Sequence, residues 1–518
     1  MGLATSWDMR LGYESFEQLE REFSWDEAWD LVDGTPEAIN ATAECLDRHT
    51  GTAAKIVFDD GSTTALSFEE LSVKAARFAH ALDDFGLSIN DRVAIMLDPS
   101  EEFLVSFFGT MKHGAGAVPC SELFGPEALN YRLEDSGSAV LVSSSRVLEA
   151  VDADLVDYQF MKTELLDDIR GFDDEYEPNT TGNDEAWVQY TSGTTGRPTA
   201  VSYNHSSVAH FAPVMDFVLN FDDEDTCLTT SSTGWGTGIW VGTFAPLVHG
   251  VQTGYYSGRF NPELTLEAIE ALDINTLIGV VPTAYRKLLD AMQESDVDPT
   301  VEKAHYVGEP IDADLSRSVE EFFGAFPRST YGATELRSVV TLDYGFPDYE
   351  FRHGSMGKPM VGLEVTVVDV DEQPLPPGEI GRIAFQRGEN WVVSDDAAYY
   401  DEDGYFWSAG RMDDTIISAA YTIGPQEVED SLRTHLAVAQ AGVIGIPDEE
   451  RGEVVKAFVE VTAEPTEELR GEIQTHVRER LSKHEYPREI EFISAVPTTP
   501  DGKIKREALR EREGILDQ

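Results

Sequence analysis

The stretch YTSGTTGRPTAV, residues 190–201, combines two glycines with a run of hydroxyl side chains. Gly193 and Gly196 allow backbone amides to turn inward and approach an anion closely. Four hydroxyl residues could add further donors: Thr191, Ser192, Thr194 and Thr195. The G-x-x-x-x-G-K-[ST] pattern of a Walker A loop is missing, and Thr199 stands where a lysine would be expected after Pro198. We expect a phosphate-binding loop of another kind, with an ordinary surface turn as the alternative.

The chain around this loop alternates short apolar runs with amphipathic stretches. Segments 91–97, 138–145 and 275–282 have the length and apolar content of buried strands, whereas 101–115 has apolar residues at helical spacing. Strand–helix alternation is typical of α/β layers with parallel sheets. The sequence therefore predicts an α/β fold, and 518 residues require more than one domain.

The pattern changes near residue 411. Segment 424–435 is predicted to be a helix, because Pro425 stands near its first turn and Val428, Leu432 and Leu436 recur at intervals of four. Further elements are expected after it: strands at 439–448, 455–461 and 488–494 and a helix at 469–481. We therefore predict a large N-terminal domain of layered α/β subdomains at 1–411 and a mobile, smaller α+β domain at 412–518.

Acidic residues dominate the composition, with 96 Asp and Glu against 38 Lys and Arg and a formal net charge of -58. The acids are scattered among apolar segments and form no blocks, which argues against disorder. Most of the cations are arginines. Such a surface suits a salt-rich cytoplasm, where screening removes self-repulsion, so we expect a halophilic protein. It also argues against a nucleic-acid partner, because phosphate backbones bind basic faces.

Cysteine usage and the N-terminus favour a cytoplasmic location. Three cysteines, Cys45, Cys120 and Cys227, give neither a disulfide framework nor a zinc spacing. The first residues lack the basic and apolar regions of a secretory signal. No apolar run approaches the roughly 18 residues that span a bilayer, so no membrane span is expected. The sequence carries no signal for an oligomeric state.

Four further motifs follow the glycine-rich loop in order: VGEP at 307–310, YGATE at 331–335, SDDAAYYDEDGYFWSAGRMDD at 394–414 and PTTPDGKIKREALR at 497–510. Together with TSGTTGRP they resemble the motifs of the adenylate-forming superfamily, which includes acyl-CoA synthetases, luciferases and adenylation domains. The segments STGWGTGIWVGTFAPLVHG, VVPTAYRKLL, GSMGKP and LPPGEIGRIAF look most like those of medium-chain acyl-CoA synthetases and their acetyl-CoA synthetase cousins. The resemblance extends over most of the chain.

The resemblance implies a reaction in two halves. A carboxylate attacks the α-phosphorus of ATP, with Mg2+, to give acyl-AMP and pyrophosphate; the thiol of coenzyme A then displaces AMP. It implies three catalytic residues: Lys503, Glu335 and Thr194. The residues it implies for nucleotide binding are Thr191, Ser192, Gly193, Thr195, Gly196, Gly308, Glu309, Pro310, Tyr331, Gly332, Thr334, Asp396 and Arg411.

The first half-reaction concentrates negative charge at the α-phosphorus, which explains the roles implied for Lys503 and Glu335. Lys503 would place a point charge on a long stem near the α-phosphate and the carboxylate. Glu335 would be a hard oxygen ligand of Mg2+. Tyr331 would stack near adenine, and Asp396 and Arg411 would bind the ribose. Structural alternatives are a surface lysine for Lys503, a solvated surface acid for Glu335 and Asp396, and a core tyrosine for Tyr331.

The same resemblance implies residues for the acyl pocket, for the hinge between the domains and for the passage of coenzyme A. Trp235 would line the acyl tunnel, unless it is a core residue. The resemblance implies that acetate-specific relatives have a tryptophan at the position of Gly332, which shortens the acyl pocket. Glycine leaves space there, so we expect an acyl group larger than acetyl. Asp413 matches the hinge about which the small domain swings. Ala419 and Ala420 would border the passage for the CoA thiol. His205 matches a family histidine that is equally well explained as structural.

Three residues depart from the family pattern: Thr199, Ala420 and Thr422 stand in place of lysine, glycine and arginine. A methyl group at Ala420 would crowd the thiol arm, and Thr422 supplies no charge. Three functions therefore remain open. The chain is an acyl-CoA synthetase, an adenylating enzyme with poor or no transfer to CoA, or a nucleotide- or acyl-binding homologue that has lost turnover.

Overall fold

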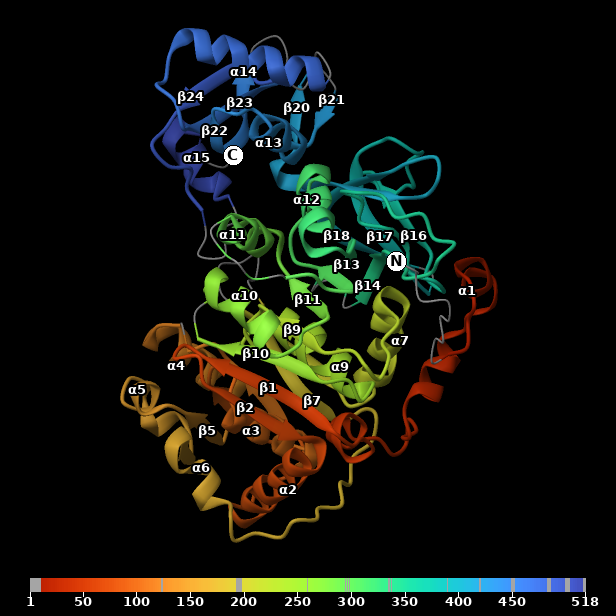
Figure 1. Cartoon of the computed structure of the whole chain (residues 1–518), viewed down its shortest axis with the longest axis vertical. Helices are drawn as coiled ribbons and strands as arrows, with labels where there is room; N and C mark the ends of the chain where they lie inside the picture. Colours follow the sequence, from red (N-terminus) through yellow and green to blue (C-terminus); the bar gives the residue numbers. More distant parts are fainter. Residues whose placement is uncertain are drawn as a thin grey trace. The chain divides into compact units, whose positions relative to one another are not determined.

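The computed structural model (Figure 1) describes residues 11–515 with the exception of 123, 192–197, 259, 294, 296, 298, 334–335, 337, 389, 419–420, 449–451, 482–485 and 499–503. At residues 191, 333, 338, 413, 417, 421, 422 and 452 it describes the backbone without the side chain. Contacts divide the chain into two units. The first comprises Met1–Glu309, Leu315–Thr330 and Asp343–Phe351, and the second Pro310–Asp314, Tyr331–Leu342 and Arg352–Gln518.

A six-stranded sheet of the first unit carries the glycine-rich loop. Its order is β6–β5–β3–β4–β7–β8. Its strands are β3 (Arg92–Met96), β4 (Gly116–Pro119), β5 (Val140–Ser143), β6 (Tyr158–Met161), β7 (Glu185–Thr191) and β8 (Thr199–Asn204). Neighbours are parallel except β7 and β8, which are antiparallel. Strands β3 and β5 lie within the segments predicted as strands, which confirms those predictions.

A second sheet contains the run β13–β12–β11–β9–β10–β1–β2. Its strands are β1 (Thr52–Phe58), β2 (Thr63–Ser67), β9 (Cys227–Thr229), β10 (Thr253–Ser257), β11 (Thr276–Val280), β12 (Lys303–Tyr306) and β13 (Pro327–Ala333), the last belonging to the first unit as far as Thr330. The neighbours in this run are parallel, except that β2 turns back antiparallel to β1. Parallel strands put their carboxyl ends at one edge, where ligands of such sheets bind.

The helices from the N-terminus to residue 323 are α1 (Phe16–Glu22), α2 (Phe68–Asp84), α3 (Glu101–His113), α4 (Pro126–Ser136), α5 (Ser145–Leu148), α6 (Lys162–Asp168), α7 (Ser207–Leu219), α8 (Gly236–Ile239), α9 (Ala245–Val248), α10 (Pro262–Ala271), α11 (Pro282–Met292) and α12 (Ala313–Phe323). Short 3₁₀ or π turns lie at η1 (Trp25–Leu31), η2 (Ala43–Asp47), η3 (Ala153–Leu155) and η4 (Trp240–Phe244). Helix α3 confirms the predicted helix 101–115. Ser100 caps it by accepting from the Phe103 amide, and Gly114 ends it with φ +99°.

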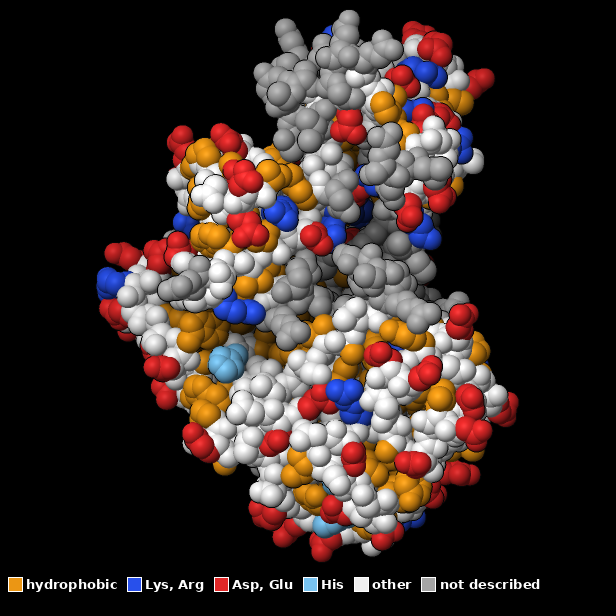
Figure 2. All heavy atoms as spheres, turned by 180° about the vertical axis from the view of Figure 1, so that it is seen from behind, with side chains coloured by type: hydrophobic (Ala, Val, Ile, Leu, Met, Phe, Trp, Pro, Cys, Tyr) orange, Lys and Arg blue, Asp and Glu red, His pale blue; other side chains and the backbone are white. Residues whose placement is uncertain are grey.

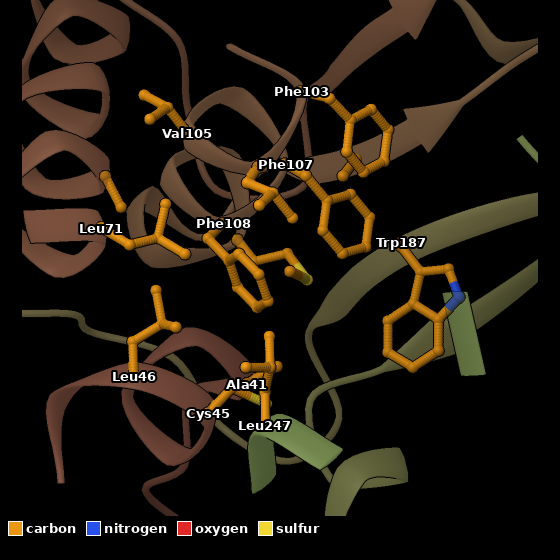
Figure 3. Packing of buried hydrophobic residues seen from close by; sticks show 14 of the residues in the cluster. Ala41, Cys45, Leu46, Leu71, Phe103, Val105, Phe107, Phe108, Trp187 and Leu247 are labelled. Atoms are coloured by element: carbon orange, nitrogen blue, oxygen red, sulfur yellow. The ribbon is translucent and has the colours of Figure 1, made fainter. Parts of the chain in front are cut away.

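Aromatic packing anchors the strand that leads into the glycine-rich loop. Phe103, Phe107 and Phe108 of α3 are fully buried in one cluster with Trp187 of β7, as Figure 3 shows. The Trp187 ring lies 4.5 Å from the ring of Phe244. Burying each such side chain stabilises the fold by about 1.5–3 kcal/mol. Residue 191, four positions beyond Trp187, therefore starts the loop from a fixed point.

The second unit contains two further sheets. The antiparallel order β16–β17–β18–β19 comprises β16 (Val365–Val368), β17 (Gly381–Arg387), β18 (Asn390–Tyr400) and β19 (Phe406–Arg411). Strands β14 (Ser338–Leu342) and β15 (Lys358–Pro359) form an antiparallel pair, and the 3₁₀ turn η5 (Met412–Asp414) follows β19.

The C-terminal elements form the fourth sheet. Its order is β21–β20–β23–β22, with β24 paired to β23. The elements are β20 (Ile416–Ser418), β21 (Tyr421–Ile423), α13 (Pro425–Arg433), β22 (Val438–Asp448), β23 (Gly452–Val461), α14 (Glu467–Arg480), β24 (Glu489–Phe492) and α15 (Arg506–Glu513). These agree with the predicted strands and helices, and Val428 and Leu432 are fully buried as their spacing indicates. The prediction that Leu436 belongs to the buried face of this helix is wrong, because α13 ends at Arg433 and Leu436 is 99% exposed.

The surface matches the composition. Figure 2 shows acidic side chains distributed over the face in view, with few basic ones among them. Among the helices that the structure describes, none combines the length and the apolar character of a membrane-spanning segment. The predicted α/β class is confirmed.

Candidate functional site

The two ends of the glycine-rich loop are held in place. Thr191 and Thr199 are cross-strand partners of β7 and β8. The Tyr190 hydroxyl donates to Asp135 Oδ2 at 2.8 Å, and the Tyr131 hydroxyl donates to the Pro198 carbonyl at 3.0 Å. Burial, reinforced by Asp135, raises the pKa of Tyr190, which keeps its proton for this bond. The predicted loop residues between the strands lie outside the described residues: Ser192, Gly193, Thr194, Thr195 and Gly196.

Residues after β11 and β12 gather at the carboxyl ends of these parallel strands. The Thr283 hydroxyl, in the first turn of α11, donates to Glu309 Oε2 at 2.7 Å. Gly308 has φ +87°, a backbone conformation that glycine adopts without strain. The predicted Gly308 and Glu309 thus form a turn whose carboxylate is oriented by Thr283, a residue that the sequence analysis missed. Pro310 follows as an exposed residue that belongs to the second unit.

A compact polar cluster lies in the second unit. The Tyr331 hydroxyl donates to Asp396 Oδ2 at 2.7 Å, and Asp396 lies directly opposite Arg411 in the register of β18 and β19. Arg411 Nη1 lies 3.6 Å from Asp396 Oδ1. Ser394 is fully buried; its hydroxyl lies 3.0 Å from the Tyr331 hydroxyl and accepts from the Asp396 amide at 2.9 Å. Three predicted residues therefore meet here.

Ser394, the first residue of the motif at 394–414, was assigned no role from the sequence. Its burial and its bond from the Asp396 amide indicate that the hydroxyl helps to orient Asp396. The next residue, Asp395, is half exposed and lies 3.3 Å from Arg411 Nη2. Gly332, one residue after Tyr331, is exposed on β13. Thr334 and Glu335 lie outside the described residues.

The remaining predicted residues of the second unit fall near the C-terminal sheet. Asp413 lies in the 3₁₀ turn directly after β19, and its side chain is not described. Ala419, Ala420 and Lys503 lie outside the described residues. The segment 499–503 starts and ends at a fixed place, because Thr498 and Ile504 form an antiparallel bridge and the Lys505 amide donates to the Pro497 carbonyl at 2.9 Å. The chain on either side of Lys503 is therefore held.

Trp235 precedes α8 and is 48% exposed, so the core alternative for this residue is wrong. Its ring packs edge-on against Phe124 at 5.6 Å, and Arg132 lies over the Phe124 ring at 4.0 Å. Gln189 of β7 donates from Nε2 to the carbonyl of Gly234 at 3.3 Å. Trp235 thus forms part of an aromatic surface beside the strand that leads into the glycine-rich loop.

Two buried histidines have structural contacts. His205 Nδ1 accepts from the Ala41 amide at 3.0 Å, and burial lowers the pKa of His205 to about 4. His305, which the sequence analysis missed, accepts from the Gly279 amide at 3.2 Å through Nδ1 and contacts the Thr330 hydroxyl at 2.9 Å through Nε2. Burial lowers the pKa of His305 to about 3. Gly279 has φ +63° within β11, and the Ser231 hydroxyl donates to its carbonyl. A neutral His305 therefore stabilises a bulge next to the segment that contains Trp235.

A pocket of about 670 Å3 lies elsewhere in the first unit. Its lining is rich in carboxylates: Asp59, Asp98, Glu122, Arg146, Tyr256, Gly258, Phe260, Asn261 and Leu264. Burial, with Glu122 adding to the effect, raises the pKa of Asp98. None of the predicted nucleotide-binding residues lines this pocket, and its carboxylates would repel a phosphate group. Within the described part of the chain, moreover, His, Cys, Asp and Glu form no group of three that could hold a metal ion.

Comparison with known proteins gives matches along almost the whole chain. Residues 45–391 match the family model of AMP-binding enzymes, and residues 427–503 match that of the AMP-binding enzyme C-terminal domain. Acetyl-coenzyme A synthetase of Bacillus subtilis (strain 168) is 33% identical, over 96% of this chain and 95% of its own. The mitochondrial acyl-coenzyme A synthetase ACSM3 of Rattus norvegicus is 30% identical, over 97% and 94%.

Among solved structures, the crystal structure of an acyl-CoA synthetase from Brucella canis is 30% identical, with a TM-score of 0.74. The match covers 97% of this chain and 99% of that one. The large N-terminal domain and the separate C-terminal domain predicted from the sequence correspond to the two matched families. The predicted resemblance is thereby confirmed.

Proposed function

The chain belongs to the AMP-binding enzyme family, and on that premise we propose that it activates a carboxylic acid larger than acetate with ATP and transfers the acyl group to coenzyme A. Membership makes it an AMP-forming acid–CoA ligase. The carboxylate attacks the α-phosphorus, pyrophosphate leaves, and the thiol of coenzyme A then displaces AMP from the acyl-adenylate.

The cluster around Asp396 is the single observation that best supports a nucleotide site. Its carboxylate accepts from Tyr331 at 2.7 Å and lies opposite Arg411, and a carboxylate group can accept several hydrogen bonds at once. The ribose of ATP offers two adjacent hydroxyl donors. We propose that Asp396 accepts from the ribose, that Arg411 assists, and that Tyr331 borders the adenine. We further propose that Glu309, oriented by Thr283, takes part in nucleotide binding together with Gly308 and Pro310.

The phosphates would be bound by the glycine-rich loop, through Thr191, Ser192, Gly193, Thr194, Thr195 and Gly196. Lys503 would neutralise the charge that develops at the α-phosphorus, Glu335 would bind the Mg2+ that accompanies ATP, and Thr334 would contribute to nucleotide binding. Support for the loop comes from its fixed ends at Thr191 and Thr199.

We propose Trp235 and Gly332 as the residues that determine which acyl group is accepted. Support comes from the half-exposed ring of Trp235 and from the lack of a side chain at Gly332, which leaves room for an acyl group longer than acetyl. The similarity to acetyl-coenzyme A synthetase of Bacillus subtilis favours a short acid, whereas the name of ACSM3 specifies an acyl group without its length. The residue at 332 leads us to propose an acid longer than acetate.

Movement between the half-reactions would occur at Asp413, with the mobile domain beginning at Met412. Support comes from the 3₁₀ turn at Met412–Asp414 and from the gap between the matched ranges, which end at 391 and resume at 427. Ala419 and Ala420 would then border the path of the thiol. The acidic composition leads us to propose a halophilic enzyme. The resemblance to acyl-CoA synthetases leads us to propose a role in fatty acid metabolism, and the sparse cysteines a cytoplasmic location.

Pyrophosphate release tests this function, measured at high salt with a panel of straight, branched and aromatic acids, with and without coenzyme A. Acid-dependent release that requires coenzyme A for continued turnover, together with thioester formation, is the expected result. Equal release without coenzyme A would favour an adenylating enzyme with poor transfer, which Thr422 in place of arginine supports. Absence of release with every acid would refute both.

A further inference from the structure

One buried amide in the first unit has an unused acceptor. Gln189 is 4% exposed, and its Nε2 donates to the Gly234 carbonyl. Its Oε1 is buried and has no hydrogen-bond partner within the part of the chain that the structure describes. Buried polar atoms are nearly always satisfied, and no described residue donates to this amide oxygen, so it is suited to accept from a bound ligand. The Nε2 contact also fixes which end of the amide is the oxygen, since a carbonyl accepts only from N–H.

The segment 234–238, whose Gly234 carbonyl accepts from Gln189, has room for an added side-chain atom at one of its glycines. A methyl group added at Gly234 would come within 2.4 Å of the Ser121 amide nitrogen, and one added at Gly238 within 2.2 Å of the Ser232 carbonyl oxygen. Both glycines are therefore required by close packing. Gly236 differs, because among the residues that the structure describes a methyl group there would meet Gln189 Cγ alone, at 3.9 Å. Free space thus lies beside the Gln189 side chain.

This space has an aromatic border. Trp235 lies between Gly234 and Gly236, is half exposed, and packs against Phe124. The surroundings of Gln189 therefore combine an apolar aromatic wall with a single buried acceptor. A ligand that is mainly apolar and carries one hydrogen-bond donor satisfies both features, whereas a plain hydrocarbon chain would leave the acceptor unpaired.

We propose that Gln189 determines the specificity of the acyl pocket and that the acid this chain activates carries a hydroxyl or uncharged amino group that donates to Gln189 Oε1. The inference rests on the proposed function, since it places the acyl group beside Trp235. Sites built to hydrogen-bond a substrate group discriminate strongly against the analogue that lacks it. The preferred substrate is thus a hydroxy- or amino-substituted acid.

Matched pairs of acids test this. The kcat/KM for acid-dependent pyrophosphate release is measured for straight-chain acids of three to eight carbons with and without a hydroxyl at each position, and for benzoate with its monohydroxy and monoamino isomers. At least one substituted acid is expected to exceed its unsubstituted partner by about tenfold or more, which corresponds to 1.4 kcal/mol. Preferences within threefold for every pair would overturn the proposal.

Variants assign the preference to the residue. Gln189→Leu keeps the approximate volume and removes the acceptor, so the ratio within the preferred pair should fall to near one. Gln189→Glu retains an acceptor and should retain a preference. The matched control is Gln159→Leu, because Gln159 is exposed on β6 of the same sheet. Thermal unfolding verifies that each variant is folded; if Gln189→Leu is not, Gln189→Met takes its place.

The outcomes separate this inference from the function on which it rests. Release with some acids but without a hydroxyl or amino preference would overturn the role of Gln189 and leave the ligase function standing. A preference that survives in Gln189→Leu would assign the discrimination to another residue and overturn the proposal. Absence of release with every acid would overturn the proposed function, and this inference with it.

Discussion

The hydroxyl of Tyr331 donates to Asp396 Oδ2 at 2.7 Å, on the side chain that faces Arg411 across two antiparallel strands. We expect Asp396→Asn to raise the KM for ATP about 10- to 100-fold, because hydrogen bonds to a charged group contribute about 1.5–3 kcal/mol. Tyr331→Phe should have a smaller effect, since it removes one donor to the carboxylate and keeps the ring.

Asp395→Asn is the matched control for this prediction. Asp395 is half exposed and pairs with Arg411 at the surface, where an ion pair contributes about 0–1 kcal/mol. Initial-rate kinetics with varied ATP should show less than a threefold change in KM for this variant. An Asp395→Asn effect as large as that of Asp396→Asn would mean that net charge, and not the position of Asp396, controls nucleotide binding.

Because His305 is buried in its neutral form, we expect the folded state to lose stability in acid. Burial lowers the pKa of His305 to about 3, so the folded state keeps the ring neutral while the unfolded chain takes up a proton below its ordinary pKa of 6.5. Its contribution is therefore fully present above pH 6.5 and declines as the pH falls toward 3. Protonation would place an N–H at Nδ1 against the Gly279 amide donor.

His305→Gln tests this explanation, because glutamine can accept and donate without titrating. The free energy of unfolding of the native protein should fall by up to about 1.4 kcal/mol more per pH unit than that of the variant between pH 6 and 4. Denaturant titrations at constant high salt measure the difference. Parallel curves for the two proteins would contradict the assigned cause, and His205 would then account for the acid sensitivity.

Arg506 Nη2 donates to both carboxylate oxygens of Glu429, at 2.8 and 2.7 Å, and the Glu429 side chain is fully buried. Arg506→Met leaves that carboxylate buried without its main partner, and we expect the C-terminal elements to lose about 3–5 kcal/mol of stability. Hydrogen exchange of α13 and β22 amides measures the loss. Arg512→Met, which breaks an exposed pair with Glu491, should cost about 1 kcal/mol or less.

The double variant Glu429→Met/Arg506→Met distinguishes a buried charge from lost packing. It should be more stable than Arg506→Met, because no carboxylate remains unpaired. A double variant less stable than Arg506→Met would show that Glu429 contributes mainly through its bond from the Val443 amide.

Gly332 predicts the size of the acid. It is exposed on β13 and its φ is not positive, so the backbone accepts a side chain there. Gly332→Trp should lower kcat/KM for acids of six carbons or more by at least tenfold relative to acetate and propionate, because the indole would fill the space proposed for the acyl chain. Gly332→Ala is the control and should shift the ratio far less. Unchanged selectivity in Gly332→Trp would place the pocket elsewhere.

Apolar periodicity and the order of the motifs predicted much of the fold and part of the candidate site. Apolar runs located β3, β5 and β11, and Asp396 and Arg411 were predicted from a motif before the register showed them facing each other. Leu436 was wrong because spacing alone does not reveal where a helix ends. Ser394, Thr283, His305 and Gln189 were missed because their importance depends on contacts between segments distant in sequence, which a local pattern does not contain.

Lys503 is the residue on which the chemical step depends most. It follows Gly502 in a segment whose flanks are held by the bridge between Thr498 and Ile504. Removing a well-placed donor from the developing charge at phosphorus costs about 10² to 10³ in rate, so Lys503→Ala should lower acid-dependent pyrophosphate release by that factor. Lys505→Ala, two residues away, is the matched control and should retain most of the activity.

The second half-reaction separates a chemical role of Lys503 from a structural one. Supplied with acyl-adenylate prepared beforehand, Lys503→Ala should form thioester from coenzyme A at a rate within about tenfold of the native protein, because the charge it neutralises develops only while ATP is cleaved. Equal loss in both half-reactions would indicate that the substitution disturbs the C-terminal domain as a whole. Undiminished pyrophosphate release would assign the stabilisation of the transition state to another cation.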